Sequence, residues 1–317
     1  MKSVFFSIWV TSLLMITACN DAKVMTMTTA KSGEVVIKMA GTGTFAIDWR
    51  DGTAIETHTL REYNLNDWRR NKYEFSHNYS VQLSHVITIT GENIKHFYCN
   101  ANDVTDLNIN NNTKLTNLNC SDNQLKSLDV SRNTALQCLD CSYNQLASLD
   151  VSNNTALGIL FCNNIKLTIL DISHNKRLEA FTCYNNQLTN LDMSQNTELA
   201  LMNYSNNQLT SLDVSQNTEM IFLDCSNNQL INLDVSGCRA LSDLKCSKND
   251  LTSLDVSNNT ELQILDCWRN QLTTSALNAL FRTLHSKKVS QSIDIRENPG
   301  SETCDITIAQ AKGWAVN

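Results

Sequence analysis

The sequence predicts a solenoid of about nine short stacked coils, preceded by a small domain rich in β-strands and followed by a short cap. Two observations carry this prediction. Segments on either side of the middle lack its regular period. Within the middle, one position recurs every 21 residues and is cysteine in eight copies and tyrosine in one: Cys99, Cys120, Cys141, Cys162, Cys183, Tyr204, Cys225, Cys246 and Cys267.

The repeat unit reads L-x-x-L-x-C-x-x-N-x-L, and Ile165 is the one break in its asparagine column. A coil of this length cannot bury its apolar edge alone, so stacking must bury a continuous column of leucine, valine and cysteine. Alternation along a short strand directs the leucine and cysteine inward and their neighbours outward. The asparagine falls at a turn, where its amide can satisfy backbone groups.

This pattern resembles leucine-rich repeat proteins, especially the internalin-like and short-repeat lipoproteins of bacterial surfaces, with cysteine at one inward leucine site. The resemblance implies a leucine-rich repeat solenoid over residues 96–275, built mostly from short parallel strands and turns. It implies protein partners, such as proteins on a host cell, and it brings no catalytic residues with it. The fold class expected is therefore this solenoid with a small N-terminal β-sandwich and a C-terminal helical cap.

A second motif, L-D-V-S, lies on the far side of each coil and suggests another short extended segment, because 21 residues leave little room for a helix. Its aspartates form a column in which like charges repel by about 1 kcal/mol in water. A calcium ion could relieve that repulsion; alternatively, each carboxylate binds a turn amide and stays solvated. The second alternative is preferred, and no metal or cofactor is expected. The column is Asp129, Asp150, Asp171, Asp192, Asp213, Asp234 and Asp255.

The repeated cysteines could form disulfides, bind metal or simply fill a narrow core. Neighbours in register on parallel strands keep their Cβ atoms about 4.8 Å apart, beyond the roughly 3.8 Å that a disulfide prefers. Cys138 and Cys141 form the single C-x-x-C, with no second half for zinc. We therefore expect buried free thiols, with Cys138 on the outer, concave face and Cys304 in the cap.

Residues 1–18 read as a secretory signal: a positive start and an uncharged apolar run that ends in Ile16-Thr17-Ala18 before Cys19. Small residues before a cysteine resemble the bacterial lipobox, which implies lipidation of Cys19, a tether over 19–22 and attachment to the outer membrane. An ordinary signal peptide is the alternative. Whether the anchored protein faces the periplasm or the outside stays open.

Residues 23–95 contain three alternating segments, 33–39, 44–49 and 84–91, that predict strands. The stretch from Ala46 to Gly52 is similar to the W-x-D-G hairpin of PKD-like, immunoglobulin-type sandwiches, and His77-Asn78-Tyr79 fits the same pattern. In the cap, 276–317, helical spacing predicts a helix over 276–285 with Ser275 as N-cap. A strand over 292–296, a turn at 298–300 and a final helix over 306–314 are expected to follow.

The chain shows no nucleophile elbow, phosphate loop or zinc His-Glu motif, so no enzymatic activity is expected. A net charge of −7 argues against a nucleic-acid partner. Outward strand positions are mostly small and polar, but apolar side chains gather in the middle coils and favour a protein-binding surface. Glycan binding through Phe161, Tyr184 and Trp268, or a structural envelope role without a ligand, are the alternatives. The predicted site is Ile159, Phe161, Tyr184, Leu201 and Phe222.

Overall fold

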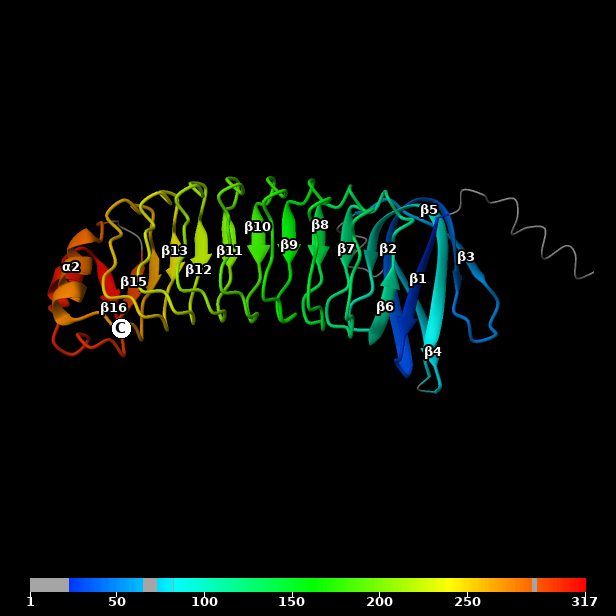
Figure 1. Ribbon diagram of the computed structural model, residues 1–317, viewed down its shortest axis with the longest axis horizontal. Coiled ribbons are helices and arrows are strands. Elements are labelled where there is room, and N and C mark those ends of the chain that lie inside the picture. Colours follow the sequence, from blue (N-terminus) through cyan, green and yellow to red (C-terminus); the bar gives the residue numbers. More distant parts are fainter. Residues whose placement is uncertain (1–22, 65–72, 82, 287–289) are drawn as a thin grey trace, which may run out of the picture.

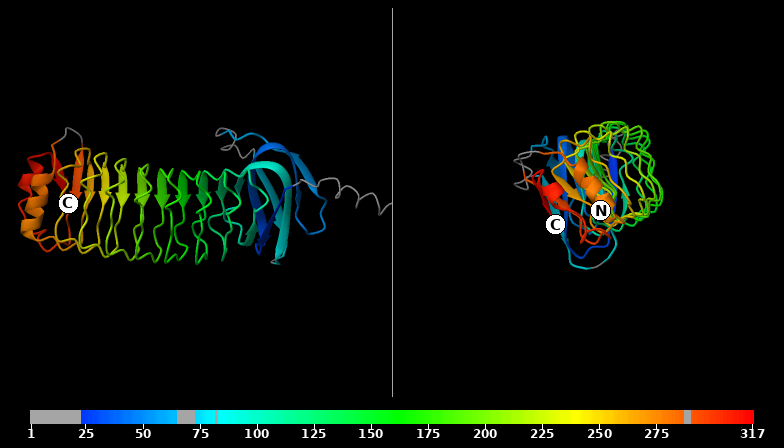
Figure 2. Two further views of the ribbon diagram at one scale, coloured as in Figure 1. Left: turned by 45° about the horizontal axis from the view of Figure 1, so that its top comes forward. Right: turned by 90° about the vertical axis from the view of Figure 1, so that its left-hand side faces the viewer.

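The computed structural model describes residues 23–64, 73–81, 83–286 and 290–317. Its main body is a row of short parallel strands that stack side by side along the long axis (Figure 1). The row is nearly straight in both Figure 1 and Figure 2, so the strand side is only weakly concave. Extended segments on both sides of a coil need similar spacing, whereas helices on one side would force the stack to curve. None of the described helices is long and apolar enough to span a membrane.

Each solenoid strand is three residues long and pairs in register with the next coil. The predicted period is confirmed, since neighbouring strands begin 21 residues apart. The strands are β7 (Asn117–Asn119), β8 (Cys138–Asp140), β9 (Ile159–Phe161), β10 (Ala180–Thr182), β11 (Leu201–Asn203), β12 (Phe222–Asp224), β13 (Asp243–Lys245) and β14 (Ile264–Asp266).

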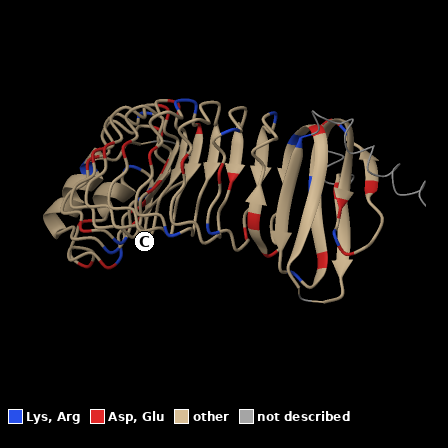
Figure 3. Ribbon diagram, turned by 45° about the vertical axis from the view of Figure 1, so that its right-hand side comes forward, with Lys and Arg blue, Asp and Glu red and all other residues tan. Residues whose placement is uncertain are grey.

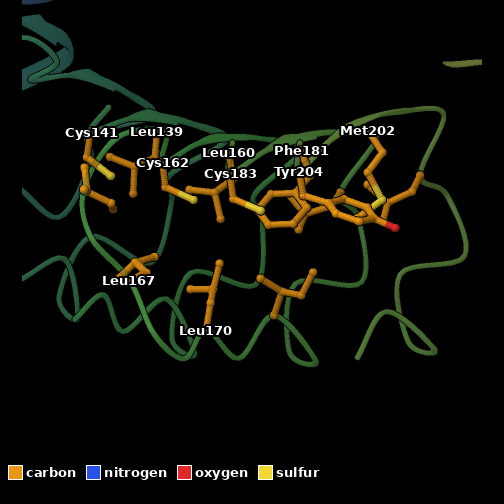
Figure 4. Packing of buried hydrophobic residues seen from close by; sticks show 14 of the residues in the cluster. Leu139, Cys141, Leu160, Cys162, Leu167, Leu170, Phe181, Cys183, Met202 and Tyr204 are labelled. Atoms are coloured by element: carbon orange, nitrogen blue, oxygen red, sulfur yellow. The ribbon is translucent and has the colours of Figure 1, made fainter. Parts of the chain in front are cut away.

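The inward column is a continuous core that runs the length of the solenoid. Cys141, Cys162, Cys183 and Tyr204 follow one another along one wall, opposite Leu167 and Leu170 (Figure 4). All eight cysteines of the column are buried and unbridged, as expected from the parallel Cβ geometry. Burial raises the pKa of their thiols, for example that of Cys99 to about 12, so they act as small core side chains.

The asparagine of the repeat joins each coil to its neighbours. Nδ2 of Asn144 donates to the carbonyls of Cys120 (2.9 Å) and Cys141 (3.0 Å), and its Oδ1 accepts the N–H of Leu125 (2.9 Å). The predicted role at the turn is therefore confirmed. The residue after the turn serine has a left-handed backbone, as in Asn185 with φ 55°.

A second asparagine column on the opposite wall escaped the sequence analysis, although the S-x-N-T spacing repeats with the same period. Nδ2 of Asn154 donates to the carbonyls of Val130 (2.9 Å) and Asn133 (2.9 Å), and the side chain is fully buried. Cys238 takes this place in one coil, where its thiol donates to the carbonyl of Val214. This contact explains the buried position of a cysteine that lies outside the 21-residue column.

The N-terminal strands join the same hydrogen-bonded sheet as the solenoid, because the end of β5 pairs in parallel with β7. The pairing does not confirm a separate immunoglobulin-like sandwich. The predicted strands over 33–39 and 44–49 form one strand, β2, which passes through an irregularity where a Cβ on Gly41 would lie 2.0 Å from the carbonyl oxygen of Asn93. The strands are β1 (Val24–Thr29), β2 (Gly33–Asp48), β3 (Glu56–Thr59), β4 (Glu74–Tyr79), β5 (His85–Tyr98) and β6 (Val104–Asn108).

The predicted hairpin after Ala46 is present between β2 and β3. Trp49 is buried and donates from Nε1 to Glu56 (2.7 Å), while His77 lies 2.6 Å from Asp51 and stacks on the Trp49 ring. These contacts tie β4 to the turn.

The C-terminal end combines a helix with two further strands. Helix α2 (Thr274–Thr283) starts at the N-cap Thr273, two residues before the predicted Ser275, and buries Leu277, Leu280 and Phe281. Strand β15 (Gln291–Asp294) adds a tenth strand to the row that begins at β5, and Asn298 continues the asparagine ladder beneath it. The predicted final helix over 306–314 is wrong in extent: α3 (Thr307–Gln310) is one turn, and Trp314 begins β16 (Trp314–Val316).

Candidate functional site: the strand face of the solenoid

We call the surface formed by the outward side chains of β7–β14 and the residues next to them the strand face. Ile159, Leu201 and Phe222 occupy one column of it, because Ile159 pairs with Ala180, Ala180 with Leu201, and Leu201 with Phe222. Ile159 is 36% exposed and Leu201 48% exposed, while Phe222 is half-buried. Three of the five predicted residues are thus brought together.

Ile221 belongs to the same surface and was missed. Its N–H donates to the carbonyl of Ala200 (2.8 Å), which places it beside the neighbouring coil, and its side chain is 46% exposed. It precedes the strand, outside the outward columns read from the sequence, although an isoleucine among small or polar residues at that period was a visible signal. We define the apolar patch as Ile159, Leu201, Ile221 and Phe222.

Phe161 and Tyr184 lie on the strand face outside this patch. Phe161 is half-buried in the column that contains Asp140 and Thr182. Tyr184 lies beyond the end of β10, where its hydroxyl is 2.7 Å from that of Tyr143, and this hydrogen bond together with burial raises the pKa of Tyr184 to about 12. The two tyrosines form a separate aromatic edge that spans three coils.

Carboxylates replace apolar side chains beyond Phe222. We define the acidic strip as Asp224, Asp243 and Asp266 on β12, β13 and β14, with Lys245 between them. Burial raises the pKa of the Asp243 carboxyl above its usual range; Lys245 opposes this shift and Asp224 adds to it. Burial likewise raises the pKa of Asp266, in spite of a hydrogen bond from Ser247. These carboxylates lack sufficient positive charge around them.

The aspartate column on the far side of the coils has the opposite electrostatics. Each carboxylate accepts the N–H of the serine two residues later, as Asp150 does from Ser152 (2.9 Å). These serine hydrogen bonds lower the pKa of most of the column, for instance that of Asp192. The structure thus has the turn-amide contact that was preferred over calcium. Among the described residues, no group of three or more His, Cys, Asp or Glu is arranged to hold a metal ion.

The remaining candidates fall into two groups. Cys19 lies outside the described residues, so its lipidation stays a prediction. Cys138 is half-buried on the strand face, as expected, and Cys304 is half-buried in the cap. Trp268 lies four coils from Tyr184, or about 19 Å at the usual strand spacing, so these two rings cannot contact the same sugar.

Solved structures with this architecture include internalin-type proteins. The functional domain of InlJ from Listeria monocytogenes, described as including a cysteine ladder, matches with a TM-score of 0.62 and 37% identity over 68% of this chain. The match spans 47% of the InlJ domain. InlF from Listeria monocytogenes strain 4b F2365 aligns at 17% identity and a TM-score of 0.42, covering 70% of this chain and 86% of that one. No protein-family model and no curated protein matches the chain.

The fold and the InlJ likeness define the class: this is a leucine-rich repeat solenoid of the internalin-like kind, built on a cysteine ladder. Proteins of this class support a protein-interaction role. The chain spans about half of the InlJ domain that it matches, so nothing about the whole of that protein follows for this one.

Proposed function

We propose that this protein is a non-enzymatic, exported lipoprotein that recognises a protein partner through the strand face of its solenoid. The observation that carries the proposal is the apolar patch. Large apolar side chains stand partly exposed at the centre of a face whose other positions are mostly small and polar. A contiguous apolar area with a polar rim is typical of a protein-binding surface.

The scaffold strengthens this argument. Inward positions hardly vary along the chain because each must fit the same narrow coil, whereas the outward positions differ from coil to coil. A face whose side chains are held at fixed spacing by a rigid ladder loses little conformational entropy on binding. Adhesion to proteins on a host cell is the more specific form of the proposal, and it is supported by the likeness to the InlJ domain.

A comparison of purified variants tests the proposal. Leu201→Ser combined with Phe222→Ser removes apolar contacts from the strand face, while Ile169→Ser combined with Ile231→Ser removes exposed isoleucines elsewhere on the coils. Surface proteins cross-linked to the wild type and to the control pair, but not to the strand-face pair, are the expected result. Equal capture by all three proteins would place binding elsewhere.

The membrane anchor needs its own test. Cys19→Ser should move the protein from the membrane fraction to the soluble fraction, because a lipidated cysteine at this position would be the attachment point. Protease treatment of intact cells then separates an outward-facing protein, which is cleaved, from a periplasmic one, which survives until lysis. Persistence of the Cys19→Ser variant in the membrane fraction would remove lipidation from the account.

A further inference from the structure

We propose that the partner contacts the strand face with a short segment that carries apolar side chains followed by lysine or arginine: the apolar side chains bind the apolar patch and the cations bind the acidic strip. The inference rests on the proposed function and specifies the chemistry of the partner. It is argued from the layout of the strand face alone.

The two halves of the surface are continuous. Phe222, in the apolar patch, pairs directly with Asp243, in the acidic strip, and Leu201 pairs with Phe222 on the other side. The change from apolar to acidic therefore takes one strand step, about 4.8 Å. From Ile159 to Asp266 the surface crosses five such steps, or about 24 Å, which an extended segment of about seven residues would span.

The positive charges near the strip are already engaged by other groups. Lys245 lies over the ring of Phe222 (5.3 Å), Lys248 over that of Trp268 (4.8 Å), and Arg269 faces Glu297 (3.9 Å). Arg296 forms an ion pair with Asp294. In the described part of the chain, no ion pair holds a carboxylate of the acidic strip.

The strip therefore has three carboxylates and one ammonium, Lys245, which leaves an excess of negative charge. Asp243 adds a specific opening, because its Oδ1 is buried and has no hydrogen-bond partner among the described residues. A buried acceptor without a partner is costly, and a guanidinium or ammonium from outside would satisfy it. Acidic and basic residues are interspersed along the solenoid without a large basic area (Figure 3), so a second copy of this acidic chain is a poor source of such cations.

The experiment pans a library of random octapeptides against the purified full chain and measures the affinity of the most enriched peptide by fluorescence anisotropy. One variant combines Asp224→Asn, Asp243→Asn and Asp266→Asn. Its matched control makes the same three-charge change in the far-side column. There, asparagine can still accept the serine N–H through its side-chain oxygen, and the substitutions are Asp150→Asn, Asp192→Asn and Asp234→Asn.

The expected result is enrichment of peptides with apolar residues next to at least two lysines or arginines. The acidic-strip variant should weaken the affinity about tenfold, and the control should change it by less than about twofold. Raising the salt from about 0.05 M to about 0.5 M should weaken binding to the wild type.

Enrichment of neutral apolar peptides that need Leu201 but not the acidic strip would overturn this inference and leave the proposed function standing. Equal weakening by the two triple variants would reduce the effect to net charge and would also overturn it. If no peptide is enriched, the inference fails, and the capture comparison of the strand-face pair decides the proposed function separately.

Discussion

Replacing Asn207 with alanine tests whether the asparagine ladder holds neighbouring coils together. Nδ2 of Asn207 donates to the carbonyls of Cys183 (3.1 Å) and Tyr204 (2.9 Å), and its Oδ1 accepts the N–H of Leu188 (3.1 Å). Each of the two carbonyls keeps another asparagine, Asn186 or Asn228, as a donor. The N–H of Leu188 would be left buried without this acceptor.

The magnitude follows from these contacts. An orphaned buried N–H costs about 1–3 kcal/mol, and losing the two donated bonds adds about 1 kcal/mol. Asn207→Ala should therefore lower the free energy of unfolding by about 2–4 kcal/mol. The neighbouring Gln208 is exposed, so Gln208→Ala should change it by less than about 0.5 kcal/mol.

Urea unfolding followed by circular dichroism and by intrinsic fluorescence provides the assay. Both probes are needed because stacked repeats can unfold in parts. The chain supplies the reverse experiment at Ile165, which replaces the ladder asparagine in one coil, and Ile165→Asn should stabilise the protein by about 1 kcal/mol. A loss from Asn207→Ala no larger than that from Gln208→Ala would refute the ladder as a source of stability.

Three further predictions concern the core and the turns. Tyr204 buries a hydroxyl without a described partner, so Tyr204→Phe should leave the free energy of unfolding unchanged or raise it by about 1–2 kcal/mol, and a loss above about 1 kcal/mol would contradict this. The far-side aspartates with lowered pKa stabilise the fold above their ordinary pKa of 3.8, and this stability should disappear as the pH falls through their lowered values. Melting temperatures measured from about pH 5 to about pH 2 check this, and the far-side triple asparagine variant should show a flatter profile. Among the described cysteines, Cys138 and Cys304 should react with a thiol reagent in the native protein before any buried cysteine does, with mass spectrometry as the readout; early labelling of Cys183 would contradict the closed core.

The repeated core was predictable because the same constraint acts in every coil. Cys141 and Leu139 must fit the same space as their counterparts one period away, so the sequence shows the inward column directly. The second asparagine column was just as regular but was not recognised, since the serine and threonine around Asn154 also fit an ordinary exposed turn.

The ends of the chain were harder because no repeated neighbour constrains them. An irregularity at Gly41 lets β2 continue where a break was expected, and this depends on the close approach of Asn93 from a distant strand. In the cap, apolar spacing over 306–314 fits a helix, but Trp314 instead pairs with Gln291 at the edge of the sheet. Tertiary pairing outweighed local helical preference there.

The candidate site was predictable in part. Ile159, Leu201 and Phe222 could be placed together because the 21-residue period fixes their register. Ile221 and the separation of Tyr184 from the apolar patch required the path of the chain beside each strand, which the period alone does not specify.

Site-specific photo-cross-linking tests the central claim, that the strand face is the binding surface, most directly. A photoreactive amino acid is placed at Leu201 in one variant and at Ile169 in another; Ile169 is 79% exposed but lies outside the strand face. In illuminated cells that make the protein and are mixed with partner cells, the account predicts discrete cross-linked species from position 201 and none from position 169. Cross-links from position 169 alone, or equal yields from both, would contradict it.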